Sequence, residues 1–186
     1  MTRRHLVLAL ALLALPLAAS ESSKKYFGGI DLVDQNGKPE NLAKLMEGRT
    51  VLINTIFTSC DASCPIMEKT FATIQDHYAT QMGKELVLVS ISVDPANDTP
   101  AKLKAYAKTM KAKDGWYFLT GTKEQVDYAL KRFGVPAETR DMHSNLMFAG
   151  NDKTGLWKKI HGTAKTEEIV PVVDSVLNDK GEAKAQ

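Results

Sequence analysis

Two cysteines, Cys60 and Cys64, are four residues apart and are the only cysteines in the chain. They lie in residues 57–65, where an apolar β-branched segment gives way to a helical pattern. On one helical turn, side chains four apart share a face and lie about 5–6 Å from each other. Two sulfurs so placed can converge on a soft metal ion or form a disulfide. A helix N-terminus also favours thiolate over thiol.

The cysteine pair is a poor structural staple and a good candidate for chemistry. A bridge between Cys60 and Cys64 would close a very short loop, whereas disulfide stabilisation grows with loop length. Thiolates select Cu(I), Zn(II) or iron–sulfur clusters, and two cysteines are too few for a cluster. Redox motifs of the thioredoxin type have two residues between the cysteines, and this one has three.

A third ligand is predicted at His143, in the loop 140–144 that directly precedes an apolar segment. In a thioredoxin-like fold this loop faces the cysteine-bearing turn. A neutral imidazole there would complete a three-coordinate site of Cys60, Cys64 and His143 for copper, as Cu(I) or Cu(II). Asp141 is a candidate to orient the imidazole. The alternative is a solvated loop histidine.

Other side chains with ligand or aromatic character are expected to be structural. Histidines outside the predicted site are assigned to the N-terminal segment, a helix end or a loop, and methionines and aromatic residues at helix or strand spacing to the core. These residues are His5, His77, His161, Met67, Met142, Met147, Tyr106, Trp116 and Tyr128.

Hydrophobic periodicity predicts an α/β fold. Strands are expected at 26–33, 50–57, 85–93, 116–119, 145–149 and 156–160, and helices at 65–81, from 100, at 122–133 and at 166–177. The core face of the first helix is assigned to Ile66, Phe71, Ile74 and Tyr78. A βαβ start and a closing β-hairpin plus helix give a thioredoxin-like fold, with a central mixed sheet flanked by helices and an N-terminal extension. Asp94 and Asp98 are interpreted as loop and cap builders.

The N-terminal twenty residues have the order of a secretory signal. Arg3 and Arg4 precede an apolar run over 6–19, and small residues lead to Ser20. The run is shorter than the roughly 20 residues of a spanning helix. We expect a signal peptide at 1–20, a copper-binding domain at 24–177 and a flexible tail at 178–186. The expected location is the periplasm, with an uncleaved signal that tethers the chain to the inner membrane as the alternative.

The charge balance argues against polyanionic partners. The chain has 24 basic and 22 acidic residues, and loss of Arg3 and Arg4 with the signal leaves 22 of each. No basic block remains in the mature part, so nucleic acid and anionic membrane surfaces are excluded as partners.

Four separated motifs resemble the Sco/SenC family of copper-binding assembly factors for cytochrome c oxidase, over residues 26–177. The motifs are Cys60-Asp61-Ala62-Ser63-Cys64-Pro65, the stretch 92–100 followed by Leu103 and Tyr106, the stretch 119–122, and His143. The family usually has an acidic residue directly before the histidine, where this chain has Met142. It also often keeps a membrane anchor. The resemblance implies a copper metallochaperone or a thiol reductant that acts on the dinuclear copper site of oxidase subunit II.

Three functions therefore compete at the same cysteines. The first is copper delivery to oxidase subunit II or another copper-site protein, with a separate copper donor. The second is thiol–disulfide oxidoreduction through Cys60 and Cys64. The third is a peroxidase-like reaction in which one cysteine forms a sulfenic acid, and it leaves His143 without a role. Copper delivery predicts that His143→Ala weakens Cu(II) binding while disulfide exchange survives.

Overall fold

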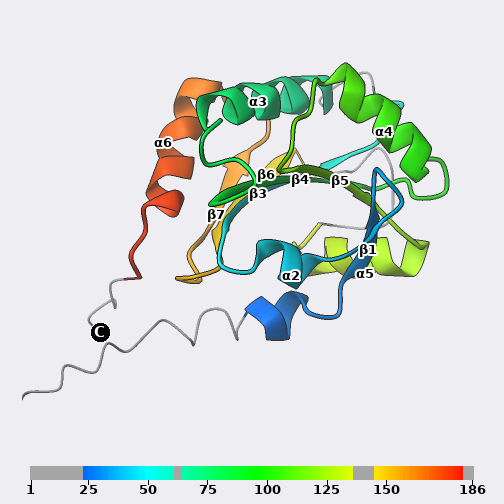
Figure 1. Cartoon of the computed structure of the whole chain (residues 1–186), viewed down its shortest axis with the longest axis horizontal. Coiled ribbons are helices and arrows are strands. Elements are labelled where there is room, and N and C mark those ends of the chain that lie inside the picture. The colour runs from blue at the N-terminus through cyan, green and yellow to red at the C-terminus, as the bar shows by residue number, and fades with distance from the viewer. Residues whose placement is uncertain (1–22, 61–63, 136–144, 182–186) are drawn as a thin grey trace, which may run out of the picture.

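One mixed seven-stranded sheet organises the protein (Figure 1). The computed structural model describes residues 23–60, 64–135 and 145–181. The elements in chain order are β1 (Asp31–Asp34), β2 (Pro39–Asn41), α2 (Leu42–Met46), β3 (Thr50–Ile56), α3 (Cys64–His77), β4 (Leu86–Ser92), α4 (Pro100–Thr109), β5 (Trp116–Thr120), α5 (Lys123–Arg132), β6 (Leu146–Asn151), β7 (Trp157–His161) and α6 (Thr166–Leu177). Within these residues no helix is long and apolar enough to cross a bilayer.

The parallel strands β3, β4 and β5 form the centre of the sheet, in the order β2-β1-β5-β4-β3-β6-β7. Strands β3 and β4 are buried along their whole length, as expected for parallel strands covered on both faces. The β1–β2 hairpin adds antiparallel to β5, and the β6–β7 hairpin adds antiparallel to β3. The predicted thioredoxin-like α/β architecture with a mixed sheet is therefore confirmed.

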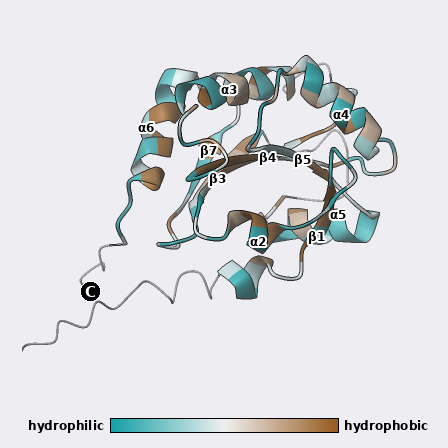
Figure 2. Cartoon of the chain, in the orientation of Figure 1, coloured by the Kyte–Doolittle hydropathy of each residue, from teal (hydrophilic) through white to brown (hydrophobic). Residues whose placement is uncertain are grey.

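Helices cover both faces of the sheet and divide the core into two clusters. Helices α3, α4 and α6 lie on one face, and α2 and α5 lie on the other (Figure 1). Alternate residues of β3 feed the two clusters: Leu52 and Ile56 face α3, whereas Val51 and Ile53 face α2 and α5. Figure 2 shows the hydrophobic strands enclosed between helices whose outer sides are polar. Cys64 belongs to the α3 side, which we call the cysteine face of the sheet.

The predicted helix starts in the middle of the chain are confirmed. Thr99 caps α4 by accepting a hydrogen bond from the Lys102 N–H, and Pro100 follows in the first turn. Thr122 and Gln125 form a capping box at α5. Gly134 ends that helix with a φ of +68°, in the left-handed region that glycine adopts without strain.

The first strand was predicted at residues 26–33, and the structure contradicts its first half. Residues 23–27 are helical, and the chain becomes extended only at Asp31. Gly28 closes the helical turn with a hydrogen bond to the Lys24 carbonyl, and a Cβ at Gly28 would lie 2.2 Å from that oxygen. The Gly28–Gly29 pair thus separates Phe27, buried in the core, from the strand. The short helix α2, capped by Asn41, was not predicted either.

Two core assignments are also wrong. Ile66 is 52% exposed, because it lies two positions after the buried Cys64 and therefore on the far side of α3. Met67 fills the core position instead. Tyr128 is 39% exposed and lies against Arg132 on the surface of α5. Trp116, Phe71 and Ile74 are buried as predicted.

Candidate metal centre

The two cysteines lie at the corner where β3 ends and α3 begins. After Ile56 the chain turns back, and the Cys60 N–H donates to the Phe57 carbonyl at 3.0 Å. Helix α3 starts at Cys64, whose N–H donates to the Cys60 sulfur at 3.4 Å. Cys64 is buried and Cys60 is partly exposed, and they are not bonded to each other. Cys60 is therefore the sulfur that an incoming ion or partner meets first.

Burial governs the acidity of the inner thiol. It raises the pKa of Cys64 well above the ordinary range, and the hydrogen bond with Cys60 acts in the same direction. A hydrogen bond with the Phe57 backbone lowers the pKa and offsets only part of this shift. The positive end of α3, expected to favour thiolate, is thus outweighed at Cys64 by desolvation. Desolvation therefore disfavours the thiolate form of Cys64.

Asp98, in the loop between β4 and α4, braces the cysteine-bearing turn. Its carboxylate accepts hydrogen bonds from the Thr58 N–H at 3.1 Å and from the Thr58 hydroxyl at 2.5 Å. The Ser92 hydroxyl donates at 2.6 Å to Oδ2, the same carboxylate oxygen that accepts from the Thr58 N–H, while the Thr58 hydroxyl binds Oδ1. Asp98 is 1% exposed, so these bonds are made out of contact with water. They fix the turn that carries Cys60 to the end of the neighbouring strand.

This role of Asp98 differs from the predicted one. Asp94 is a loop builder as expected, since its carboxylate accepts from the Asn97 side chain. The cap of α4 is Thr99, and Asp98 instead binds Thr58, forty positions earlier in the chain. Local sequence patterns do not identify such a partner, because the contact exists only after β3 and β4 pair. The burial of Asp98, which indicates its structural role, cannot be deduced from the sequence around it.

A buried carboxyl group lies one turn beyond Cys64 on α3. Glu68 is fully buried, and its Oε1 accepts from the Asn54 amide at 2.6 Å and from the Ser90 hydroxyl at 3.3 Å. Burial raises the pKa of Glu68 to about 7, although both hydrogen bonds act to lower it. Within the described residues, Glu68 Oε2 and Asn54 Oδ1 have no hydrogen-bond partner. Sequence analysis did not single out this group.

Tyr106 of α4 also belongs to the surroundings of the cysteines. Its hydroxyl is buried and has no hydrogen-bond partner in the described part of the chain. Burial raises the pKa of Tyr106, and the nearby groups Glu68, Cys64 and Cys60 raise it further. The ring packs edge-on against Phe118, with centroids 6.1 Å apart. Tyr106 therefore combines the predicted packing role with an unshared proton near the two thiols.

Most of the other candidate donors lie where the sequence suggested, but His161, expected in a loop, is the last residue of β7. His77 and His161 are exposed, and the His161 ring contacts the Thr163 hydroxyl at 2.9 Å. Met67 and Met147 are buried in the core. His143, Asp141 and Met142 lie outside the described residues.

The described part of the site has the donor set of a soft metal ion, but it is incomplete. Cys60 and Cys64 supply two adjacent sulfurs. The Cys60 side chain is partly exposed to solvent, and the Cys64 side chain is buried in the core. Between residues 23 and 181, gaps excepted, no cluster of three His, Cys, Asp or Glu side chains could hold a metal. Two thiols fit Cu(I), which accepts low coordination numbers and thiolate ligands. Any third ligand would come from outside the described residues or from a partner.

Comparison with known proteins agrees with this chemistry. The family model SCO1/SenC matches residues 18–178. A relative from Stutzerimonas stutzeri, named for copper binding, is 30% identical over 160 residues, which is 81% of this chain and 76% of the relative. Across the curated relatives, the match spans between 50% and 76% of their length.

Solved structures share the fold. BsSco, described as a member of the Sco family of cytochrome c oxidase assembly proteins with a disulfide switch, is 28% identical with a TM-score of 0.67, over 81% of this chain and 92% of its own. Arabidopsis thaliana ScoI, solved with copper bound, is 25% identical with a TM-score of 0.65, over 80% and 93%. Because the family model matches residues 18–178, which include every helix and strand named above, the chain belongs to the SCO1/SenC family.

Proposed function

We propose that this chain is an exported copper metallochaperone, which binds one copper ion through Cys60, Cys64 and His143. Its cargo would go to the dinuclear copper site of cytochrome c oxidase subunit II. The observation that carries the proposal is the pair of adjacent thiols at the β3–α3 corner, one partly exposed and one buried. The turn is braced by the buried Asp98, as a preorganised binding site requires.

The described contacts next to His143 support its assignment as the third ligand. The Asn145 carbonyl accepts a hydrogen bond from the Gly162 N–H at 2.6 Å. Gly162 in turn lies so close to Met67 that an added Cβ would be 2.4 Å from the Met67 sulfur. Met67 is in the first turn of α3, three residues after Cys64. Two residues of chain span at most about 7 Å, so the anchored Asn145 is compatible with the proposed approach of His143 to this turn.

The proposed delivery proceeds by exchange of ligands between two proteins. A cysteine of the partner displaces the exposed sulfur of Cys60 first, because Cys64 is shielded by the core. A second ligand of the partner then displaces the Cys64 sulfur from the copper ion. The raised pKa of Cys64 favours this step, because the released thiolate takes up a proton. Both steps conserve the oxidation state of Cu(I). We propose export to the periplasm by a signal at 1–20, with the copper domain at 24–177 and a tail at 178–186.

Titration of the reduced protein with copper tests the proposed function. The wild type is expected to bind one copper ion, either as Cu(I) or as Cu(II). The Cu(II) form is expected to show thiolate-to-copper absorption and an EPR signal. His143→Ala is expected to lower the Cu(II) affinity by about tenfold or more, which is at least about 1.4 kcal/mol. His77→Ala is the matched control, since this histidine is exposed at the end of α3. Failure of the wild type to bind copper stoichiometrically would refute the proposal.

The pH dependence of Cu(I) binding follows from the acidity of Cys64. Burial keeps this thiol protonated through neutral pH, so Cu(I) must displace its proton. The apparent Cu(I) affinity is therefore expected to rise by about tenfold or more for each pH unit between 6 and 8. Competition with a chelator of known proton affinity measures the slope. A flat profile would show that Cys64 binds without releasing a proton.

Thiol–disulfide exchange is the second candidate function, favoured by the 3.4 Å contact between the Cys64 N–H and the Cys60 sulfur. The Cys60 thiolate would attack a partner disulfide, forming a mixed disulfide and releasing one partner thiol. Cys64 would then attack Cys60, which releases the second thiol and leaves a Cys60–Cys64 disulfide. The partner gains two electrons, and an external thiol donor resets the pair. Turnover with such a donor that is insensitive to His143→Ala would favour this function over copper delivery.

A further inference from the structure

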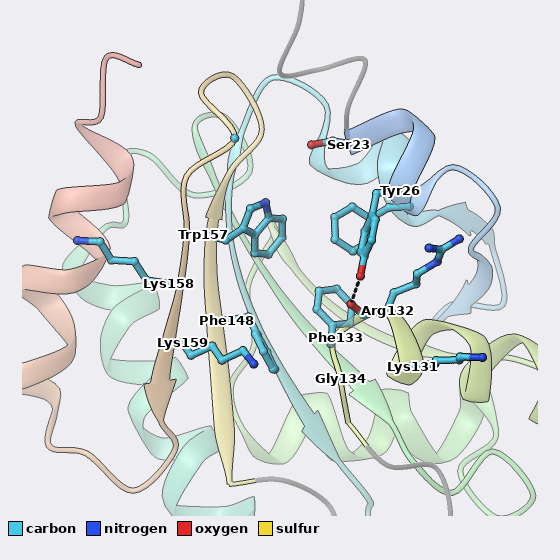
Figure 3. Close-up of a pocket in the computed structure, with 12 residues that line it drawn as sticks. Ser23, Tyr26, Lys131, Arg132, Phe133, Gly134, Phe148, Trp157, Lys158 and Lys159 are labelled. Carbon is cyan, nitrogen blue, oxygen red and sulfur yellow. Dashed lines mark hydrogen bonds between the residues drawn. The ribbon is translucent and has the colours of Figure 1, made fainter. Parts of the chain in front are cut away.

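A cavity of about 570 Å³ opens on the face of the sheet opposite to the cysteine face. Residues from the N-terminal helical turn, the end of α5 and the hairpin β6–β7 surround it (Figure 3). In Figure 3, Trp157 and Phe148 form one side, while Tyr26 and Phe133 form the other. Cavities of this volume commonly hold small organic ligands. Neither the copper site nor the thiol chemistry uses it.

Four aromatic rings form the apolar wall of the cavity. The Phe27 ring lies 5.2 Å from Phe133 and 5.3 Å from Trp157, and Phe133 lies 5.4 Å from Phe148, between ring centroids. Phe27, Phe133 and Phe148 are nearly buried, whereas Trp157 is partly exposed. Stacked and tilted rings of this kind offer flat apolar surface to another ring system.

Gly150 sets the position of the indole. It pairs with Trp157 across β6 and β7, and a Cβ at this position would lie 2.6 Å from the indole ring. The missing side chain lets the indole lie flat against the strand and leave the space beside it open. The pairing of Gly150 with Trp157 therefore determines where the indole lies in the aromatic wall.

Positive charge surrounds the cavity. Lys131, Arg132 and Lys159 line it, and none of its twelve lining residues is acidic. Among the described residues, no carboxylate forms an ion pair with these three. The Lys159 ammonium is 5.9 Å from the centre of the Phe148 ring, and Figure 3 shows it beside that ring. Arg132 lies over Tyr26 and Tyr128, with centroid distances of 4.7 and 4.9 Å. A negative group near the aromatic wall would meet uncompensated cations.

We propose that this cavity binds a small organic anion with an aromatic or polycyclic body and one acidic group. The apolar body packs against the wall formed by Trp157, Phe133 and Phe148, whose rings already contact one another. The acidic group lies toward Lys159, whose ammonium is beside the Phe148 ring, and Lys131 and Arg132 add positive charge farther along the rim; none of these charges has an acidic partner in the described residues. A purely apolar molecule would leave those charges unused, and a cation would be repelled by them. The proposal is independent of the copper site, which lies on the other face of the sheet.

Two dyes that differ only in charge test the proposal on the purified protein. The probes are anilinonaphthalene sulfonate and the neutral phenylnaphthylamine, which lacks the sulfonate. The anionic dye is expected to bind saturably with a stoichiometry of one and to quench Trp157 fluorescence. The double substitution Lys131→Gln and Lys159→Gln is expected to weaken its binding by about tenfold, which corresponds to about 1.4 kcal/mol, and to leave the neutral dye unaffected.

The matched control replaces Lys104 and Lys108, both exposed on α4 at the cysteine face, by glutamine. It removes the same net charge and is expected to leave dye binding unchanged. Thermal unfolding of all variants reports whether they fold, and copper titration reports whether the metal site is intact. Absence of saturable binding, equal affinity for the two dyes, or an equal loss in both double variants would overturn the proposal.

Discussion

Replacement of Asp98 by alanine is expected to lower the free energy of unfolding by about 3 kcal/mol and to weaken Cu(I) binding. The substitution strands the Thr58 N–H, the Thr58 hydroxyl and the Ser92 hydroxyl, all hydrogen-bonded to this carboxylate. A buried polar group without a partner costs about 1–3 kcal/mol. Because Thr58 lies two residues before Cys60, its release also loosens the outer sulfur. Chemical denaturation and Cu(I) competition measure the two effects.

Asp127→Ala provides the charge-matched control for this prediction. Asp127 forms an exposed ion pair with Lys123 on α5, and such pairs contribute about 0–1 kcal/mol. Its loss is expected to change stability little and copper binding not at all. A fully stable Asp98→Ala protein with wild-type Cu(I) affinity would show that the turn is held by other contacts.

Replacement of Glu68 by glutamine is expected to raise the free energy of unfolding at pH 8 by up to about 3 kcal/mol. The carboxyl group has an ordinary pKa of 4.5 in the unfolded chain and about 7 when folded. Between these values the native state holds a proton that the unfolded state has lost, so stability falls as pH rises from 4.5 to 7. Each unit of difference is worth about 1.4 kcal/mol. Glutamine stays neutral and removes this loss.

Glutamine also supplies a donor where Glu68 Oε2 and Asn54 Oδ1 have no hydrogen-bond partner among the described residues. Urea denaturation between pH 4 and pH 8 measures the effect, and Glu85→Gln, on the surface before β4, is the control. The wild type and the Glu85 variant are expected to lose stability in parallel as pH rises. Equal pH profiles for the Glu68 variant and the wild type would contradict the prediction.

The fold was predictable because its strong signals are local. Continuous apolar runs identify β3 and β4, and capping residues such as Thr99 and Thr122 identify where α4 and α5 begin. The errors occur where tertiary contacts decide. The strand expected from residue 26 begins only at Asp31, because residues 23–27 are helical and Phe27 packs on Phe133 and Trp157.

The candidate site was predictable only in part. The apolar strand pattern before Cys60 and the helical pattern after Cys64 predicted their position at a strand–helix corner, and the structure confirms it. Asp98 and Glu68 were not recognised as site residues, because their roles depend on burial and on partners far away in the chain. The raised pKa of Cys64 was missed for the same reason, since spacing does not report desolvation. The assignment of His143 as a ligand stays a prediction.

The outermost strands of the sheet bear on how the protein behaves at high concentration. β2 has only three residues and begins with Pro39, which offers no N–H to a further strand. At the opposite border, β7 carries Lys158 and Lys159 side by side. Short, proline-containing and lysine-rich borders disfavour sheet extension from one molecule to the next. The fold can thus display an exposed Ile66 on the outer side of α3 without inviting fibrous self-assembly through its backbone.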